Sequence, residues 1–340
     1  MDLGLLEPLS VLVDTKFKSA KSSRSLIFSP TDVAIIKTSA GIPFQLRYCP
    51  SLAKKPVSSN ESATTSVPRK KVDVFENPSS DLHIADIPTT NPSHLLVLNK
   101  FPIIASHFII ATKSNKQQTH SLEQDDLSTT YACLKAWQAE DTHKRLFAFF
   151  NSGEHSGASQ PHRHLQFLPV ENTKADLSST SWDLLLDFIL DGSEKTSSGL
   201  LQHPAVPFVH YAARLPAEPT PAQLLRIYDE LYLSAKRAVD DADLDNFQLH
   251  PTDDGSLPIS YNLAMTTDVM AIMPRRSEGG TLQLDDGTEI GFIMLNGTTL
   301  GGTLMVKYEE EWNVLREQPT KLDDILTSIG FPRATKKVKL

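Results

Sequence analysis

The sequence is poor in cysteine and has no long apolar run. Only two cysteines, Cys49 and Cys133, occur among the 340 residues. Two cysteines so far apart provide neither a disulfide framework nor a cysteine-based zinc site, which favours a reducing, intracellular compartment. No stretch approaches about 18 uninterrupted apolar residues, so we expect no membrane span and no membrane partner. The first residues, "MDLGLLEPLS", do not form a basic segment followed by a long apolar run, so we expect no secretory signal.

The chain also lacks an excess of basic residues. Its formal net charge is −8, so we expect no nucleic-acid partner. An anionic substrate would need a local cluster of lysines, histidines and backbone N–H groups. The end of the chain, "PRATKKVKL", is basic and is either a solvated tail or a nuclear-import signal. We therefore expect a cytoplasmic protein, with a nuclear location as the alternative.

The remaining composition is ordinary for a globular protein, with 40% hydrophobic and 22% charged residues. A chain of this length forms two domains or one large domain in two parts. We place an N-terminal part at residues 1–175, a C-terminal part at 176–332 and a basic tail at 333–340. The pattern predicts an α+β or α/β fold, in which helices pack on an antiparallel sheet.

Apolar periodicity predicts the individual elements. Helices are expected over residues 5–19, 122–140, 181–190, 220–241 and 322–330. Strands are expected over residues 25–38, 42–49, 145–151, 162–170, 260–267, 269–275, 290–295 and 303–308, with a further strand pair within 94–112. Residues 51–92 are rich in Ser, Pro, Lys and Asn and are expected to be irregular.

The stretch "SGASQPHRHLQFLPV" at residues 156–170 is the main candidate site. On a strand, His162, His164 and Gln166 share one face because side chains alternate. This triplet leaves three interpretations open: a polar strand face, a metal site or a histidine nucleophile. A metal site is disfavoured because glutamine is a poor ligand for transition metals and no third ligand stands nearby in a matching pattern.

The preceding loop, "SGEHSGASQP", favours the nucleophile. Its small residues, including Gly153 and Gly157, allow backbone N–H groups to converge on an anion. Gln166 adds a neutral amide donor on the face of the histidines. A neutral imidazole can attack phosphorus and form a phosphoramidate, provided that donors stabilise the phosphoryl oxygens. The loop and the triplet together therefore indicate phosphate chemistry.

The longer stretch "FFNSGEHSGASQPHRHLQ" resembles the active site of the histidine-triad superfamily. Gln166 replaces the third histidine of the hydrolase branch, which is typical of two transferase branches. These are the galactose-1-phosphate uridylyltransferases and the fungal diadenosine tetraphosphate phosphorylases, also called ATP adenylyltransferases. The resemblance to the phosphorylases extends in the same order through "PSLAKKP", "LLVLNKFPIIASHFIIAT", "SYNLAMT", "MPR", "NGTTLGGTLMVK" and "ILTSIGFP".

The resemblance implies roles for individual residues. His164 would be the nucleophile that takes AMP, Gln166 would contact its phosphate, and His162 would complete the catalytic group. The substrate-binding residues that it implies are Lys55, Asn99, Lys100, Asn151, Gly157, Ala158, Ser159, Gln160, Gln166, Asn296, Gly297, Thr298, Thr303 and Lys307.

Two positions depart from the family pattern, and several residues have plainer explanations. Thr303 stands where a methionine is expected, which puts one substrate contact in doubt. Pro161 follows Gln160 directly before the first histidine, where it would stiffen the loop. The three lysines are equally consistent with ordinary surface residues. Among the other histidines, His107, His120 and His155 are expected to be structural or to face solvent, and His155 also lies beside the expected phosphate.

The resemblance implies a HIT-like fold with an N-terminal catalytic part and a C-terminal ATP-adenylyltransferase part. The implied reaction is reversible phosphorolysis of diadenosine tetraphosphate to ATP and ADP through an AMP–histidine intermediate. ADP-sulfurylase activity would be an additional reaction. The alternatives are a sugar-1-phosphate nucleotidylyltransferase, a hydrolase and a non-catalytic nucleotide sensor.

The expected partners are small molecules: diadenosine tetraphosphate, ATP, ADP, AMP and inorganic phosphate. We expect a monomer with no tightly bound cofactor. A divalent cation, Mg²⁺ or Mn²⁺, is expected to accompany the nucleotide, because the polyphosphate adds negative charge to a protein that already carries net charge −8.

Overall fold

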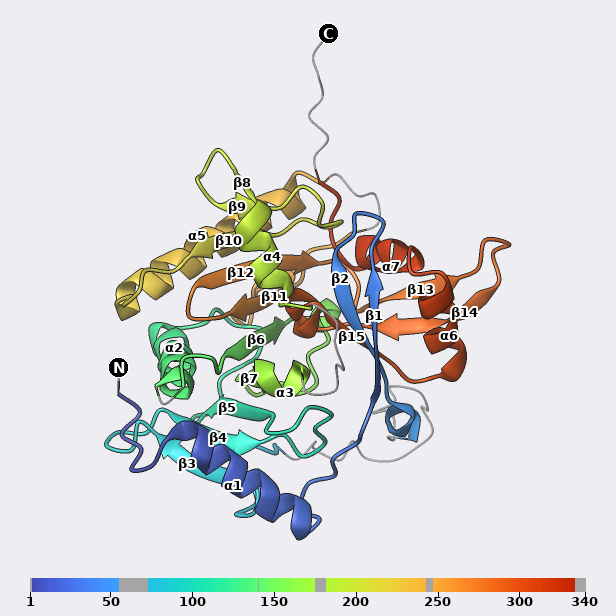
Figure 1. Cartoon of the computed structure of the whole chain (residues 1–340). Coiled ribbons are helices and arrows are strands. Elements are labelled where there is room, and N and C mark those ends of the chain that lie inside the picture. Colours follow the sequence, from blue (N-terminus) through green and yellow to red (C-terminus); the bar gives the residue numbers. More distant parts are fainter. Residues whose placement is uncertain (1, 55–72, 140, 175–181, 243–246, 334–340) are drawn as a thin grey trace, which may run out of the picture.

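The chain forms an α+β fold in which a large antiparallel sheet carries helices on both faces (Figure 1). The computed structural model describes residues 2–54, 73–139, 141–174, 182–242 and 247–333. The expected basic tail lies outside the described residues except for Arg333. No helix in the described ranges combines the length and the apolar character that a membrane crossing requires.

Within the described residues, ten strands form the main sheet, and every neighbouring pair is antiparallel. In spatial order they are β3 (His83–Ile87), β4 (His94–Leu98), β5 (Phe108–Thr112), β7 (His164–Pro169), β6 (Leu146–Ser152), β11 (Ser260–Met265), β12 (Val269–Arg275), β10 (Tyr211–Arg214), β9 (Leu201–Gln202) and β8 (Glu194–Lys195). The central pair is β6 with β11, so strands from the two halves of the sequence continue one sheet.

Two smaller sheets accompany the main one. Strands β1 (Asp32–Lys37) and β2 (Pro43–Tyr48) are antiparallel, and β15 (Thr303–Val306) adds to β2 in parallel. Strands β13 (Gly279–Gln283) and β14 (Glu289–Met294) form a hairpin. Pairing of β2 with β15 brings an N-terminal strand into the C-terminal half of the molecule.

The helices divide between the two faces of the main sheet. They are α1 (Leu9–Ser22), α2 (Gln124–Gln138), α3 (Val170–Lys174), α4 (Leu185–Gly192), α5 (Pro221–Asp240), α6 (Glu309–Glu317) and α7 (Lys321–Ile329), with short 3₁₀ turns η1 (Pro50–Lys54), η2 (Glu154–Ser156) and η3 (Gly297–Gly301). One hydrophobic core contains residues of α1, α2 and α5. A second contains residues of β1, β2, α4, α6 and α7.

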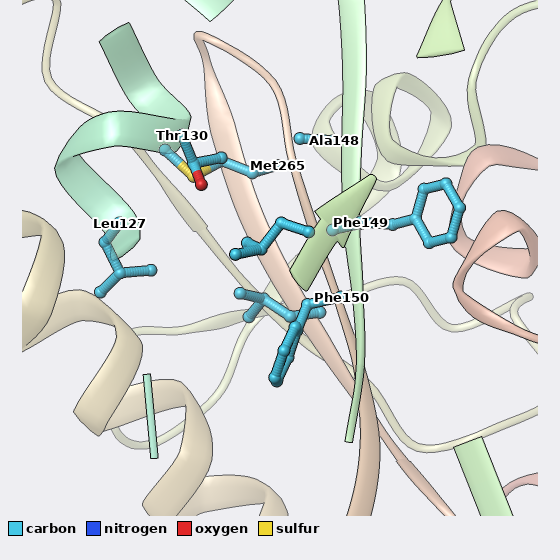
Figure 2. A pocket seen from close by; sticks show the side chains of 9 residues that line it. Leu127, Thr130, Ala148, Phe149, Phe150 and Met265 are labelled. Carbon is cyan, nitrogen blue, oxygen red and sulfur yellow. The ribbon is translucent and has the colours of Figure 1, made fainter. Parts of the chain in front are cut away.

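Alternation along β6 explains how one strand contributes to both cores. Ala148 and Phe150 belong to the core that includes α2, whereas Phe149 belongs to the other core. Figure 2 shows the ring of Phe149 turned away from α2, while Leu127 of that helix lies on the opposite side of the strand. The polar residues at the end of β6 are thereby fixed by apolar packing on both faces.

The structure confirms the most strongly patterned predictions. The helix expected over 220–241 is α5, where Thr220 accepts the N–H of Gln223 in a capping box and Pro221 occupies the first turn. The helix expected over 122–140 is α2, and the strand pair expected within 94–112 is β4 with β5.

Other predictions need correction. Strand β3 lies in the region expected to be irregular. The first helix begins at Leu9 because Pro8 precedes it, so Leu5 and Leu6 are not part of its buried stripe. The strand expected over 25–38 begins only at Asp32. Several short elements were not predicted, namely α3, α6, β8, β9, β10 and β13.

Candidate active site

His164 is the first residue of β7 and is held in one tautomer. Its Nδ1–H donates to the carbonyl oxygen of His162 at 2.8 Å, which leaves the lone pair on Nε2. Its backbone N–H donates to Oε1 of Gln118 at 2.8 Å. Burial lowers the pKa of His164 to about 4, partly opposed by the His162 carbonyl. The imidazole is therefore neutral at pH 7, the form that can act as a nucleophile.

His162 lies between two acceptors just before β7. Its Nε2–H donates to the carbonyl oxygen of Thr112 at 2.7 Å, and its Nδ1 lies 2.7 Å from Oδ2 of Asp73. Burial would raise the pKa of Asp73, but the N–H of Phe75 and the ring of His162 lower it overall. Among the contacts of the described residues, Nε2 of His164 is therefore the ring nitrogen of this pair that has no partner.

The predicted alternation along this segment is confirmed, although β7 itself begins at His164. The rings of His162 and His164 both pack against Phe75, at centroid distances of 5.6 and 5.1 Å. Arg163 points to the opposite face, where its Nη1 donates to Oδ2 of Asp126 in α2 at 2.8 Å. The intervening buried Arg163 therefore anchors the strand while the histidines remain on the other face.

Gln166 is held by a histidine from the neighbouring strand region. Nε2 of His107 lies 3.1 Å from Oε1 of Gln166, so a ring N–H donated there leaves the amide NH₂ of Gln166 to face a phosphate. Asn99 lies beside them, with Nδ2 3.5 Å from the same ring nitrogen. Its Oδ1 accepts the N–H of Phe101 at 2.8 Å. The geometry brings Asn99 and Gln166 together through His107.

The loop after β6 is held against the second half of the chain by Asn151. Its Oδ1 accepts the backbone N–H of Gly297 at 2.8 Å and Nδ2 of Asn262 at 2.9 Å. Asn262 also donates to the carbonyl oxygen of Ser156 at 2.9 Å. A Cβ on Gly157 would lie 2.8 Å from Cβ of Asn296, so loop and turn are in close contact. The structure thus brings together Asn151, Gly157, Asn296 and Gly297, four of the residues that the resemblance names as substrate-binding.

The buried side chain of Arg275 stabilises this contact between the loop after β6 and the second half of the chain. Nη1 of Arg275 donates to Oδ1 of Asn262 at 2.5 Å, and Nη2 donates to the carbonyl oxygens of Ser277 and Leu295. Burial lowers the pKa of Arg275 to about 9, partly opposed by Glu278. The guanidinium therefore stays charged at neutral pH and adds positive charge behind the loop.

The other predicted residues are placed as follows. Asn296 caps η3 by accepting the N–H of Thr298 at 3.0 Å, and the hydroxyl of Thr298 donates to the carbonyl oxygen of Thr303 at 3.1 Å. Ala158 and Gln160 are half-buried in the loop and Ser159 is exposed.

The three predicted lysines are less well defined by their contacts. Lys100 is exposed, with its Nζ 5.8 Å from the ring centroid of Phe101. The backbone N–H of Lys307 donates to Oε2 of Glu311 at 3.0 Å. These contacts do not link either lysine to the residues around His164. Lys55 lies outside the described residues.

Sequence reasoning missed several residues that position this group. Gln118 is buried and donates to the carbonyl oxygens of Asn151 and His164, joining the end of β6 to the start of β7. Its surroundings, "SNKQQTH", carry no periodic signal. Asn262 and Arg275 do lie in "SYNLAMT" and "MPR", two of the segments that carried the resemblance, so that signal was present.

Family models match both halves of the chain. Residues 6–183 match the Ap4A phosphorylase N-terminal domain, and residues 204–332 match the ATP adenylyltransferase C-terminal domain. Protein APA1 of Saccharomyces cerevisiae is 28% identical over 336 residues, covering 96% of this chain and 95% of that protein. Diadenosine 5',5'''-P1,P4-tetraphosphate phosphorylase 2 of the same yeast is 26% identical over 337 residues, with the same two coverages.

Among solved structures, yeast Ap4A phosphorylase Apa2 in complex with AMP superposes with a TM-score of 0.77 and 25% identity. The match covers 98% of this chain and 100% of that chain. The two family matches follow each other in chain order, and the similarity to the yeast proteins extends over nearly the whole chain. The chain belongs to the Ap4A phosphorylase family and is a nucleotidyltransferase.

Proposed function

We propose that this protein cleaves diadenosine tetraphosphate with inorganic phosphate, giving ATP and ADP, and that His164 carries AMP between the two steps. The observation that supports His164 most directly is its fixed, neutral tautomer, with Nδ1–H donated to the His162 carbonyl and the lone pair on Nε2. Family membership and the yeast relatives support the substrate class.

In the first step, Nε2 of His164 would attack the α-phosphorus of one adenylyl group. The new N–P bond forms as the P–O bond to the remaining triphosphate breaks, and ATP leaves. In the second step, an oxygen of inorganic phosphate attacks the same phosphorus, the N–P bond breaks and ADP leaves. His164 returns to its neutral form when the N–P bond breaks, because its proton stays on Nδ1 throughout, hydrogen-bonded to the His162 carbonyl.

The loop and Gln166 would bind the transferred phosphate. The loop residues 157–160 would supply backbone N–H groups, and the amide NH₂ of Gln166, held by His107, would supply a side-chain donor. Lys55, Lys100 and Lys307 remain proposed partners of the polyphosphate. We also propose that Mg²⁺ or Mn²⁺ accompanies the nucleotide and neutralises its charge.

Identification of the products tests this proposal. We expect ATP and ADP from diadenosine tetraphosphate only when phosphate is present. Release of AMP and ATP without phosphate would indicate a hydrolase instead. Binding without turnover would indicate a nucleotide sensor, and turnover only with a sugar phosphate would indicate a sugar-1-phosphate nucleotidylyltransferase.

A variant pair tests the nucleophile. His164→Ala should abolish the covalent AMP adduct, detected as a mass increase of the intact protein, and should remove turnover. His143→Ala, which changes an exposed histidine, is the matched control and should retain both. An adduct that survives in His164→Ala would assign the nucleophile to another residue.

A further inference from the structure

A second group of histidines lies outside the residues around His164. Glu154 and His155 belong to η2, and His250 lies on the segment that leads into β11. One ligand atom from each of these three residues lies within 4.8 Å of the other two. Oε1 of Glu154 is 3.3 Å from Nε2 of His155 and 3.7 Å from Nδ1 of His250.

The two distances from Glu154 to the histidines are close to those between ligands of one tetrahedral metal ion. Histidine nitrogen and carboxylate oxygen bind zinc at about 2.0–2.2 Å, so two ligand atoms of one tetrahedral ion lie roughly 3.3–3.6 Å apart. The two distances to Glu154 lie in or close to that range. Two histidines and one glutamate are also the protein ligands of many zinc sites that keep one position open.

The surroundings of His250 are compatible with the tautomer that a metal would need. Its Nε2 lies 2.8 Å from Oγ of Ser260, which also accepts the backbone N–H of His155 at 3.2 Å. A ring N–H donated from Nε2 to this hydroxyl puts the lone pair on Nδ1, the atom that faces Glu154. Metal-binding histidines usually donate their other N–H in this way.

Space for a fourth ligand exists beside the cluster. Glu154 and His250 line a hollow of about 420 Å³, together with Asp253, Asp254 and Ser256. These polar groups could hydrogen-bond a water on the open position of the ion.

We propose that Glu154, His155 and His250 form a binding site for a divalent transition metal of the zinc class. Imidazole ligands select such ions over Mg²⁺, which prefers oxygen, so this site is distinct from the cation proposed to accompany the nucleotide. His155 lies two residues before Gly157. A bound metal would therefore join the start of the phosphate loop to the segment before β11.

Metal titration of the full-length protein, free of any affinity tag and first treated with a chelator, tests this site. We expect one equivalent of Zn²⁺ by calorimetry, a higher Tm, and for Co²⁺ the strong visible absorption of a tetrahedral complex. Mg²⁺ in excess should not displace either ion. These measurements use no nucleotide, so their outcome is independent of the proposed reaction.

Three variants and a control assign the ligands. His155→Ala and His250→Ala should each weaken Zn²⁺ binding by roughly 100-fold or more, since even outer partners of a metal site contribute about 10–100-fold. Glu154→Gln should weaken it too, and because its side chain is 70% exposed this change should not affect folding. His143→Ala should bind zinc as the original chain does. Absence of stoichiometric binding, or binding unchanged in the three variants, would show that Glu154 only pairs with the two histidines.

Discussion

The histidines of the candidate active site differ in their partners, and these partners determine what each ring can do. His164 has a carbonyl on one nitrogen and is neutral. His162 has an acceptor on both nitrogens, one of them the carboxylate of Asp73. His107 contacts the amide oxygen of Gln166. One ring therefore suits attack on phosphorus, one is held in place by acceptors on both sides, and one suits positioning of a neighbour.

A first prediction concerns a single residue, His107. Replacing it with Phe removes the N–H that orients Gln166, so the amide can rotate and present its oxygen to the phosphate. We expect kcat to fall by roughly 10-fold, less than the roughly 100-fold expected for Gln166→Ala, because the donor remains present but is no longer fixed. Steady-state kinetics with diadenosine tetraphosphate measures both losses.

A double variant separates positioning from a general structural effect. In a Gln166→Ala background, His107→Phe should have little further effect on kcat, because the group that it orients is gone. His107→Gln, which restores an N–H donor, should recover part of the activity. Losses that simply add in the double variant would contradict the positioning role.

The motif was enough to predict that His164 and Gln166 lie on the same face of one strand. It did not predict which residues contact them and hold them in place. A two-residue alternation needs only local sequence, and "HRHLQ" supplies it. His107 and Asp73 lie 59 and 89 residues from their partners. Their contacts depend on strand pairing, and residues 51–92, which include Asp73, carried no periodic signal. His107 was expected to be structural or to face solvent, and its contact with Gln166 was not anticipated.

The contact between the glycine loop and η3 gives a prediction at the scale of elements. Gly157 has φ +77°, and a Cβ there would lie 2.8 Å from Cβ of Asn296 and 2.9 Å from the carbonyl oxygen of Leu295. Gly157→Ala should therefore separate the loop from η3 and raise KM for the dinucleotide. It should also lower the free energy of unfolding by about 1–2 kcal/mol from backbone strain alone. Urea unfolding and kinetics measure the two effects.

Gly287→Ala is the matched control for this change. Gly287 has φ +86° but a Cβ there would meet no atom within 4 Å. The two variants should share the backbone strain, while only Gly157→Ala should change KM. Equal kinetics in the two proteins would mean that the close contact with Asn296 does not shape the binding site.

The helices and strands that were predicted best are long and have residues typical of helix or strand ends at their termini. The helix α5 combined a capping residue, a proline in the first turn and a regular apolar stripe, and it was predicted nearly to the residue. Strand β13 begins with two glycines, which disfavour strand structure, and α6 begins with three glutamates and has a short apolar stripe. These two elements depend on contacts with neighbouring elements, which the local sequence does not encode.

At the scale of the whole molecule, the two halves of the sequence are joined more closely than a division at residue 175 suggests. Strand β6 pairs with β11 at the centre of the main sheet, and β2 pairs with β15. Pairings between strands so distant in sequence could not be predicted from the chain alone. They place Asn151 of the first half beside Gly297 of the second, so the loop after β6 is held in place by contacts with the second half.

Buried histidines also make the stability of the whole molecule depend on pH. Burial lowers the pKa of both His164 and His210 to about 4, partly opposed in each case by a backbone carbonyl. In the unfolded chain both have a pKa of about 6.5. Between these values the unfolded chain binds protons that the folded chain does not, so stability falls as pH falls from about 6.5 to about 4. Each histidine should contribute roughly 3 kcal/mol to this loss.

His210 is the residue with which to test this prediction, because it lies outside the candidate active site. Its Nδ1–H donates to the carbonyl oxygen of Phe208, and its Nε2 accepts the N–H of His203 at 3.0 Å, an acceptor role that protonation would remove. His210→Asn should lower the stability at pH 7, because the acceptor for the N–H of His203 is lost. It should also make the free energy of unfolding depend less on pH, with a slope near pH 5 that is smaller by about 1 kcal/mol per pH unit. Urea unfolding at several pH values between 4.5 and 7.5 measures both slopes. Parallel curves for the variant and the original chain would show that His210 does not stay neutral in the folded protein over this range.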